Sequence, residues 1–383
     1  MVRVQTGHRR APNLVNLIRS FNVSNKSMNG EFDFIERIRD RVRNGPGGSP
    51  DLVCGIGDDA AIIAQETGRE SLITVDLLVE EVDFKLEYGA PRQLGHKALA
   101  VSLSDIAAMG GIPRFSLLTL GIPPQLRPRP QDDTTASFWE EFFAGYFSLA
   151  RRFEVTLIGG DISSTPERMT IDSIVIGSCQ SGMAIKRSGA MIGDAIYVTG
   201  ELGASAAGLR TLLATPGRRL IDYEPDARWP ALCAHLEPRP RVDAGRRIGE
   251  SRLAHSMIDI SDGLAQDLGH ICEQSNVGAI IDRESIPVSP LLSLVSDSAD
   301  ERFRLAASGG EDFELLFTAA PESEEPLRRL VGPDLPLTRI GTITERGETP
   351  VLLREREGVR PLDLCGYNHF EDRSPSPPAT SED

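Results

Sequence analysis

The stretch Met257-Ile-Asp-Ile-Ser-Asp-Gly-Leu264 joins a short β-branched apolar run to three polar side chains and a glycine. Beyond it, apolar residues recur at helical spacing as far as Cys272. Asp259, Ser261 and Asp262 are therefore predicted to lie where a strand passes into a helix. The start of a helix offers unpaired N–H groups to an anion, and two carboxylates three residues apart can hold a hard cation. The alternative is that these side chains simply cap the helix.

Acids beside small residues, at the end of an apolar run, recur along the chain. One such stretch is typical of a turn, but six favour a shared acidic site. Asp and Glu oxygens with few His or Cys partners select hard cations, so Mg²⁺ or Mn²⁺ is expected and zinc is not. ATP with its Mg²⁺ ions would supply the positive charge that such a site lacks. The other five stretches are 55–61, 74–76, 102–105, 158–161 and 308–314.

Length and composition narrow the class of protein. A chain of 383 residues suits two domains, and 40% hydrophobic with 25% charged residues is normal for a globular protein. The formal net charge of −15 argues against nucleic acid or an anionic membrane as a partner. The five cysteines form no C-x-x-C pair, which indicates a reducing, cytoplasmic compartment. No run approaches the roughly 20 apolar residues of a membrane span, and residues 1–29 show no secretory signal.

Hydrophobic periodicity predicts an α+β fold with helices against one face of a mixed sheet. We expect a disordered extension over residues 1–29, a surface loop over 123–135 and a disordered tail over 371–383. Helices are expected over 31–42, 91–109, 137–153, 244–248 and 289–295, and a strand followed by a helix over 257–272. Further strands are expected over 52–54, 60–64, 71–79, 115–122, 155–158, 169–177, 195–198, 278–282, 313–318, 338–343 and 351–353.

Two segments bear on phosphate binding. The glycine-rich stretch 200–208 precedes a predicted helix, but it has the spacing of neither a P-loop nor a dinucleotide-binding loop, so close helix packing is the better interpretation. Lys186 and Arg187 would complement phosphate charge, or else form solvated surface charge. The residues alone leave these two alternatives open.

Eight short motifs follow one another along the chain: Gly30-Glu-Phe, Gly55-Ile-Gly-Asp-Asp-Ala-Ala, Lys97-Ala-Leu-Ala-Val-Ser-Leu-Ser-Asp-Ile-Ala-Ala-Met-Gly-Gly, Leu157-Ile-Gly-Gly-Asp, Arg187-Ser-Gly-Ala, Tyr197-Val-Thr-Gly, Asp259-Ile-Ser-Asp-Gly-Leu and Gly309-Gly-Glu-Asp-Phe-Glu-Leu. With the closing Gly366-Tyr-Asn-His-Phe370, their order resembles that of the thiamine-monophosphate kinase family. The resemblance covers roughly residues 30–370, and no single motif carries it.

This resemblance implies the two-domain fold shared with aminoimidazole ribonucleotide synthetase. An N-terminal domain over 30–190 would bind ATP and metal and pair with its twin in a homodimer. A C-terminal α+β domain over 191–370 would follow, with ATP and several Mg²⁺ ions in the cleft between the domains. The implied reaction is direct transfer of the ATP γ-phosphoryl group to thiamine phosphate, without a phosphoenzyme.

The resemblance also implies roles for individual residues. Gly160, Arg187 and Ser261 would contact ATP. Asp83, Glu311 and Tyr367 would line the substrate pocket, with Glu311 facing the cationic substrate and Tyr367 offering an aromatic surface. The implied metal ligands are Asp59, Thr74, Asp76, Asp105, Asp161, Asp259 and Asp262.

The chain departs from the family pattern at three places. Val75 replaces the usual Thr, Asp83 replaces a substrate-contacting His, and Ile162-Ser163 replaces paired threonines. Two other functions therefore stay open. One is a related-fold ATP-dependent synthetase, such as a selenophosphate synthetase, a hydrogenase-maturation factor or a purine-pathway enzyme. A selenophosphate synthetase would need a reactive cysteine or selenocysteine near the start of the chain, whereas the earliest cysteine here, Cys54, lies in an apolar run. The other is a non-catalytic sensor of thiamine phosphate or nucleotide.

Overall fold

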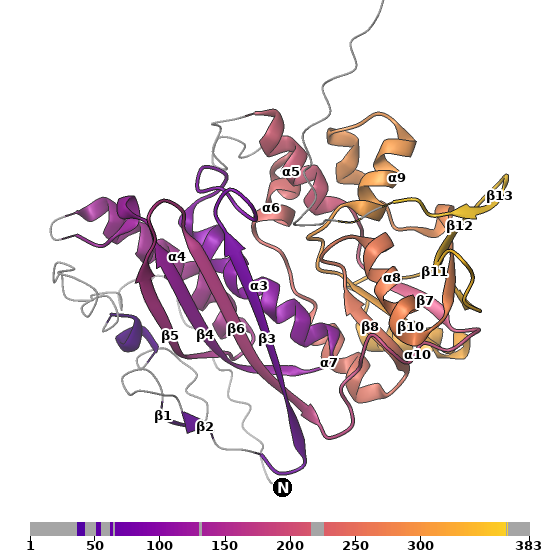
Figure 1. Ribbon diagram of the computed structural model, residues 1–383, viewed down its shortest axis with the longest axis horizontal. Helices are drawn as coiled ribbons and strands as arrows, with labels where there is room; N and C mark the ends of the chain where they lie inside the picture. Colours follow the sequence, from indigo (N-terminus) through magenta and orange to yellow (C-terminus); the bar gives the residue numbers. More distant parts are fainter. Residues whose placement is uncertain are drawn as a thin grey trace, which may run out of the picture.

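The computed structural model describes residues 37–42, 51–54, 62–63, 66–129, 132–215, 226–364 and 366. They form two halves, each built on a sheet of its own (Figure 1). The first half holds a four-stranded mixed sheet in the order β3-β6-β4-β5, in which β4 and β5 run parallel and the other pairs antiparallel. Its strands are β3 (Arg69–Val79), β4 (Ile112–Ile122), β5 (Thr156–Ser164) and β6 (Thr170–Gln180), beside a small pair formed by β1 (Leu52–Cys54) and β2 (Ile62–Ile63).

The two faces of the first sheet differ in what covers them. Along β3, Leu72 and Leu78 are buried beneath helices α3 (Pro91–Ala108) and α4 (Asp133–Arg152), whereas Ile73 and Leu77 are 70% and 58% exposed. Side chains alternate between the faces of a strand, so the sheet has one helix-covered face and one open face. The η1 turn (Pro124–Leu126) leads from β4 towards α4.

Helix α3 is buried on nearly all sides because it lies between α4 and the second half of the molecule (Figure 1). Its crossing with α4 is very close. A Cβ atom at Gly95 would lie 1.9 Å from the carbonyl oxygen of Phe142, and one at Gly145 would lie 1.9 Å from that of Arg92. Both positions therefore require glycine, and every residue of α3 from Lys97 to Ser104 is buried, the polar ones included.

The second half is built on a seven-stranded sheet in the order β13-β12-β9-β11-β7-β10-β8. Its pairs are antiparallel except for β9 and β12. The strands are β7 (Ala195–Thr199), β8 (Ala254–Asp259), β9 (Gly278–Asp282), β10 (Leu315–Ala319), β11 (Leu337–Thr344), β12 (Val351–Glu355) and β13 (Gly358–Pro361). The helices are α5 (Ala204–Ala214), α6 (Trp229–Leu236), α7 (Val242–Ser251), α8 (Leu264–Ser275), α9 (Ala299–Ser308) and α10 (Glu324–Val331), with short 3-10 turns η3 (Arg283–Ser285), η4 (Pro290–Leu294) and η5 (Pro321–Ser323).

The central strands of the second sheet bury both faces. Tyr197, Met257 and Phe317 pack into the core that also contains the apolar side of α3, whereas Ile196 and Ile258 pack into a second core beneath α8 and α9. The two halves therefore share one core, and residues on β8 are held firmly against α3.

The structure confirms the predicted α+β class and helices against one face of a mixed sheet. It corrects several elements. The predicted loop over 123–135 contains η1 and the first turn of α4, the helix expected over 289–295 is the short 3-10 helix η4, and α6, α9 and α10 were not predicted. The helix expected over 31–42 is observed in its described part, 37–42, while the proposed extension 1–29 and tail 371–383 lie outside the described residues. Among the described helices, none has the length and apolar character needed to cross a membrane.

Candidate active site

Three carboxylates from both halves of the chain converge where α3 meets the two sheets. Asp76 lies on the helical face of β3, Asp105 on the last turns of α3, and Asp259 at the end of β8. Because β8 packs directly against α3, residues far apart in sequence reach one place. The sequence prediction that Asp76, Asp105 and Asp259 share a site agrees with this arrangement.

A hydroxyl group holds each of these carboxylates in place. Ser102 Oγ donates to Asp76 Oδ2 at 2.7 Å, and Ser104 Oγ donates to Asp259 Oδ2 at 2.6 Å. The Thr74 hydroxyl donates to Asp105 Oδ2. The bond from Ser104 to Asp259 links the first half to the second. Ser102 and Ser104 were not among the predicted site residues, although the sequence shows both as polar interruptions in an apolar helix.

The charge of Asp105 raises the pKa of the other two acids. Burial, and then the charges of Asp105 and Asp76, raise the pKa of Asp259 to about 7. Burial, followed by Asp105, raises the pKa of Asp76 to about 6. Burial likewise raises the pKa of Asp105, and the hydrogen bond from Thr74 and then the positive charge of Arg187 oppose this rise. The cluster thus carries more negative charge than its surroundings neutralise.

This donor set fits hard divalent cations. The groups that hydrogen-bond to the three acids offer oxygen atoms. Among the described residues, no Lys, Arg or His side chain forms an ion pair within 4 Å of any of the three carboxylates. Mg²⁺ and Mn²⁺ prefer such carboxylate oxygens and would relieve the repulsion that raises the pKa values. Asp76, Asp105 and Asp259 are the residues that would hold the ions.

The turn between β8 and α8 carries Asp262, three residues beyond Asp259. Gly263, at φ +120°, precedes the helix and supplies no side-chain cap, so the interpretation of Ser261 and Asp262 as helix caps is wrong. The buried carboxylate of Asp267 takes that role, because Asp267 Oδ2 accepts from the backbone N–H groups of Asp262 at 3.2 Å and Gly263 at 3.1 Å. Gln266 Nε2 donates to Asp262 Oδ2 at 2.9 Å.

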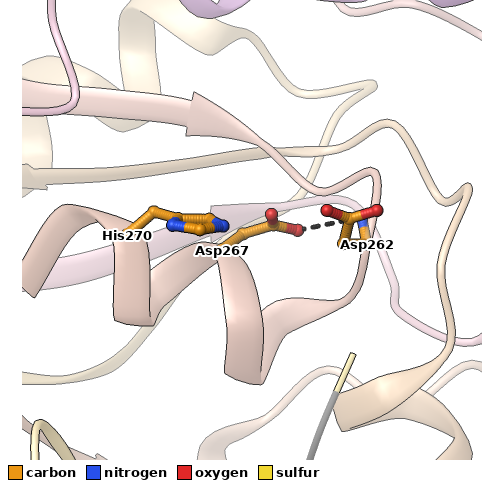
Figure 2. Close-up of side chains that lie close together, drawn as sticks. All are labelled: Asp262, Asp267 and His270. Atoms are coloured by element: carbon orange, nitrogen blue, oxygen red, sulfur yellow. Dashed lines mark hydrogen bonds between the residues drawn. The ribbon is translucent and has the colours of Figure 1, made fainter. Parts of the chain in front are cut away.

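Asp262, Asp267 and His270 lie in a row at the start of α8 (Figure 2). One ligand atom from each lies within 4.8 Å of the others. Burial, with the charges of Asp259 and Asp262, raises the pKa of Asp267 to about 8. Asp267 was not predicted, because a single acid in the first turns of an amphipathic helix resembles ordinary surface charge. Its role in fixing Asp262 depends on the local fold of the turn, which brings the N–H groups of Asp262 and Gly263 to its carboxylate.

A second charged group lies beside the turn. Lys97 Nζ is 2.6 Å from Glu311 Oε1, and His235 Nδ1 is 3.0 Å from Glu311 Oε2. Lys97 and His235 are almost fully buried. The backbone at Glu311 has a left-handed φ of +66°, and its N–H donates to the carbonyl oxygen of Ser261 at 2.8 Å. Glu311, which was predicted to face substrate, is therefore fixed next to the proposed ATP-contacting turn.

A pocket opens beside Lys97 and His235. Its walls are largely apolar and come from the segment 83–94 together with Phe138 and Leu236. Asp83 lines this pocket, but Val79 N donates to Asp83 Oδ2 at 2.8 Å, so the carboxylate also closes a turn. A role for Asp83 in substrate contact remains a proposal.

Arg187 lies on an exposed segment close enough to Asp105 to affect its pKa. This segment is anchored to the second half. Ser275 Oγ, at the end of α8, accepts from the N–H groups of Gly189 and Ala190, each at 3.1 Å. The predicted contact of Arg187 with ATP would place its guanidinium near the acid cluster.

Asp161 departs from the expected arrangement. It lies within β5 and not at the end of a strand. Across the sheet, Asp161 is level with Thr119 on β4, Asp172 on β6 and Leu77 on β3, and the Leu77 side chain is exposed. Residues that are level on neighbouring strands point to the same face. Asp161 thus points to the open face of the sheet, whereas Asp76 points to the helical face. Three strand spacings, about 14 Å, separate β5 from β3. Within one chain, the structure does not bring Asp161 into the acid cluster.

Three other predicted residues complete the set. Gly160 lies next to Asp161 on β5, where a Cβ would be 1.9 Å from the carbonyl oxygen of Leu118. Asp59 and Tyr367 lie outside the described residues. Gly366 packs against the β8–α8 turn, since a Cβ there would lie 2.6 Å from the Asp262 carbonyl oxygen.

The fold and the acid cluster together belong to the class of AIR synthase related proteins. The family model described as AIR synthase related protein, N-terminal domain, matches residues 57–179, and that of the C-terminal domain matches residues 192–353. The chain is 38% identical over 342 residues to thiamine-monophosphate kinase of Bacillus subtilis (strain 168), covering 89% of this chain and 99% of that protein. It is 39% identical over 342 residues to the Escherichia coli (strain K12) thiamine-monophosphate kinase, with coverage of 89% and 98%. The chain belongs to the thiamine-monophosphate kinase family.

Solved structures agree with this assignment. The crystal structure of thiamine-monophosphate kinase from Stenotrophomonas maltophilia K279a matches with a TM-score of 0.72 and 37% identity, over 85% of this chain and 96% of that one. AaThiL complexed with AMPPCP and TMP matches with a TM-score of 0.67 and 30% identity, over 89% and 97%. Hydrogenase maturation protein HypE in complex with ATP matches with a TM-score of 0.65 at 18% identity, a likeness of fold alone.

Proposed function

We propose that this protein transfers the γ-phosphoryl group of ATP to the phosphate of thiamine phosphate, giving thiamine diphosphate and ADP. The observation that carries the proposal is the cluster of Asp76, Asp105 and Asp259 in a chain that matches thiamine-monophosphate kinases over nearly their whole length. A phosphate oxygen of thiamine phosphate forms the new P–O bond, and the bond from the γ-phosphorus to the bridging oxygen of ADP breaks.

Mg²⁺ ions, when bound, neutralise phosphate charge and hold the attacking and leaving oxygens in line. Asp76, Asp105 and Asp259 would hold these ions, with Asp262 at the edge of the group. The family also assigns Asp59, Thr74 and Asp161 to the metals. Thr74 supports this role through its hydroxyl bond to Asp105. Asp161 would have to act from the open face of the sheet.

The side chains around the acids would orient both substrates. Arg187 offers positive charge to the phosphates of ATP, while Ser261 and Gly160 are the other proposed ATP contacts. Glu311 would attract the thiazolium cation, and the apolar pocket beside it would exclude water from the ring system. We propose no general base or covalent nucleophile, because the attacking phosphate oxygen is already anionic.

A homodimer through the first sheets is part of the proposal. The open face of β3 exposes Ile73, Val75 and Leu77, each by more than half of its surface. A row of this kind is typical of a protein interface. A cytoplasmic location is also part of the proposal, because the co-substrate is ATP and the thiols of Cys179 and Cys272 form no disulfide.

A product assay tests the proposal. The protein is incubated with ATP and Mg²⁺ and, in parallel, with thiamine, thiamine phosphate or hydroxymethylpyrimidine phosphate. Thiamine diphosphate and ADP should form only from thiamine phosphate, and Asp259→Asn should form neither. Tight binding of thiamine phosphate without product, across several divalent metals, would replace the kinase proposal with a sensor.

A further inference from the structure

Both carboxylate oxygens of Glu311 are held by side chains from two different helices. Lys97 comes from α3 in the first half, and His235 comes from α6 in the second. A carboxylate can only accept, so the N–H at His235 Nδ1 donates towards Glu311 Oε2, and the Ser205 hydroxyl oxygen lies 3.0 Å from the same nitrogen. Each oxygen keeps a further acceptor position, and the Glu311 side chain is 29% exposed. Glu311 is thus both anchored and accessible.

The anchors lie out of water, which makes their charges matter. Lys97 is 3% exposed and His235 5% exposed. A carboxylate in such surroundings favours its neutral form unless a cation or a hydrogen-bond donor compensates. An uncharged Glu311 would lose most of its attraction for an organic cation. The neighbours of Glu311 therefore decide whether it can recognise one.

We propose that Lys97 and His235 are positioning residues that keep Glu311 ionised and fixed, so that the pocket selects a substrate with a positively charged ring. This inference rests on the proposed function, since thiamine phosphate carries such a ring. Lys97 and His235 themselves line the pocket, and Glu311 lies directly behind them, so their proposed effect on the cation acts through the charge and position of Glu311.

The electrostatics of the group support this role. Burial alone would raise the pKa of Glu311, but the charge of Lys97 and then the contact with His235 outweigh it and lower the pKa to about 2. Burial and the charge of Lys97 lower the pKa of His235, which keeps the imidazole neutral. Without Lys97, burial would be opposed by His235 alone, and the pKa of Glu311 would rise.

The other acids near Glu311 have partners of their own. Asp312 accepts from the N–H groups of Gly203 at 2.6 Å and Ser205 at 3.1 Å. Glu314 accepts from Thr199 Oγ1 at 2.7 Å and from Arg241 Nε at 2.8 Å. The charged or titratable groups that face Glu311 from the packed helices are thus Lys97 on α3 and His235 on α6, and these are the residues to change.

The experiment compares Lys97→Met with Lys97→Arg, and His235→Leu with His235→Asn. The first of each pair removes the donor to Glu311, and the second keeps one. Arg354→Met, which breaks an exposed ion pair with Asp282 far from the pocket, is the matched control for loss of a cation. The KM for thiamine phosphate, the KM for ATP and kcat are measured from about pH 6 to about pH 9.

In the wild type, the KM for thiamine phosphate should vary little over this range beyond the titration of the substrate itself. In Lys97→Met it should rise about tenfold or more near pH 6 and approach the wild-type value at higher pH, as Glu311 regains its charge. Lys97→Arg should restore the wild-type profile, and the KM for ATP should stay within about twofold in all variants. A KM for thiamine phosphate that is unchanged and equally pH-independent in Lys97→Met would overturn the inference.

A binding measurement separates this inference from the kinase proposal. Calorimetry of thiamine phosphate near pH 6, in buffers of different ionisation enthalpy, counts the protons released on binding. Lys97→Met should release more protons than the wild type, because Glu311 must ionise to meet the cation, whereas equal release argues against the inference. Failure of the wild type to turn over would instead remove the proposed function. Should Lys97→Met fail to fold, the His235→Leu and His235→Asn pair tests the same difference.

Discussion

Replacing Asp105 with Asn should make the metal-free protein more stable while abolishing its activity. Asn keeps the shape and the acceptor oxygen for Thr74 but removes a charge that raises the pKa of both Asp76 and Asp259. A carboxyl group with a raised folded-state pKa contributes stability at low pH that is lost as the pH rises through that pKa. The metal-free wild type should therefore lose stability between about pH 4 and about pH 7.

The size of the gain follows from the pKa values. The rise for Asp259 from 3.8 to about 7 corresponds to about 4 kcal/mol, and that for Asp76 to about 6 corresponds to about 3 kcal/mol. Burial is the largest cause of both, and Asp105 is the second, so its removal should return on the order of 1–2 kcal/mol. For a protein of this size that is a rise in Tm of roughly 2–6 °C.

Thermal unfolding in a metal chelator, at about pH 8 and about pH 5, measures this effect. Asp105→Asn should melt above the wild type at the higher pH, and the difference should shrink at the lower pH because Asp76 and Asp259 are then protonated in both proteins. With ATP and Mg²⁺ added, the wild type should gain more stability than the variant. A variant that melts below the wild type at pH 8 in chelator, or that retains near wild-type turnover, would show that these acids do not form one repelling, metal-holding group.

Three further predictions concern other parts of the molecule. Gly245→Ala should destabilise the protein by about 2–4 kcal/mol, because its Cβ would lie 2.2 Å from a backbone oxygen of α3. The control Gly269→Ala, whose Cβ would have nothing within 4 Å, should be neutral or stabilising, and thermal melts compare the two variants. Asp83→His should change the KM for thiamine phosphate several-fold and leave the KM for ATP unchanged. Asp83→Asn still accepts from Val79 N, so it removes the charge and keeps the turn. An unchanged KM for thiamine phosphate in both variants would remove Asp83 from the substrate site. Leu77→Glu should convert a dimer into a monomer in analytical ultracentrifugation, and a monomeric wild type would reject the proposed interface.

The sequence predicted the acid cluster better than its supports. Asp105 and Asp259 interrupt regular apolar runs, so periodicity alone marks them as exceptional. Lys97 and Ser104 were visible as polar interruptions of the same helix, but no local pattern shows that Lys97 meets Glu311 or that Ser104 meets Asp259. Those contacts depend on how α3 packs against the second half, which sequence spacing does not encode.

Asp161 illustrates a different limit of prediction. Its neighbours suggested a strand end, yet β5 continues to Ser164. Side chains alternate along a strand, so whether a residue lies on the open or the helix-covered face depends on the strand register. The pairing of β5 with β4 contains a bulge between Ser116 and Leu117, which shifts this register. Helices α6 and α10, of eight residues each, are too short for periodicity to distinguish them from loops.

The hydrogen bond from Ser104 to Asp259 spans 155 residues of chain, and this separation has a consequence for synthesis on the ribosome. At about 5–20 residues per second, Asp76 and Asp105 emerge roughly 10–30 seconds before Asp259. During that interval the side of α3 that will meet β8 and α7 has no partner, so the nascent chain presents an apolar surface beside uncompensated acids. The acid cluster can be completed only after β8 has emerged, and a chain that terminates before β8 should need a chaperone and bind no nucleotide.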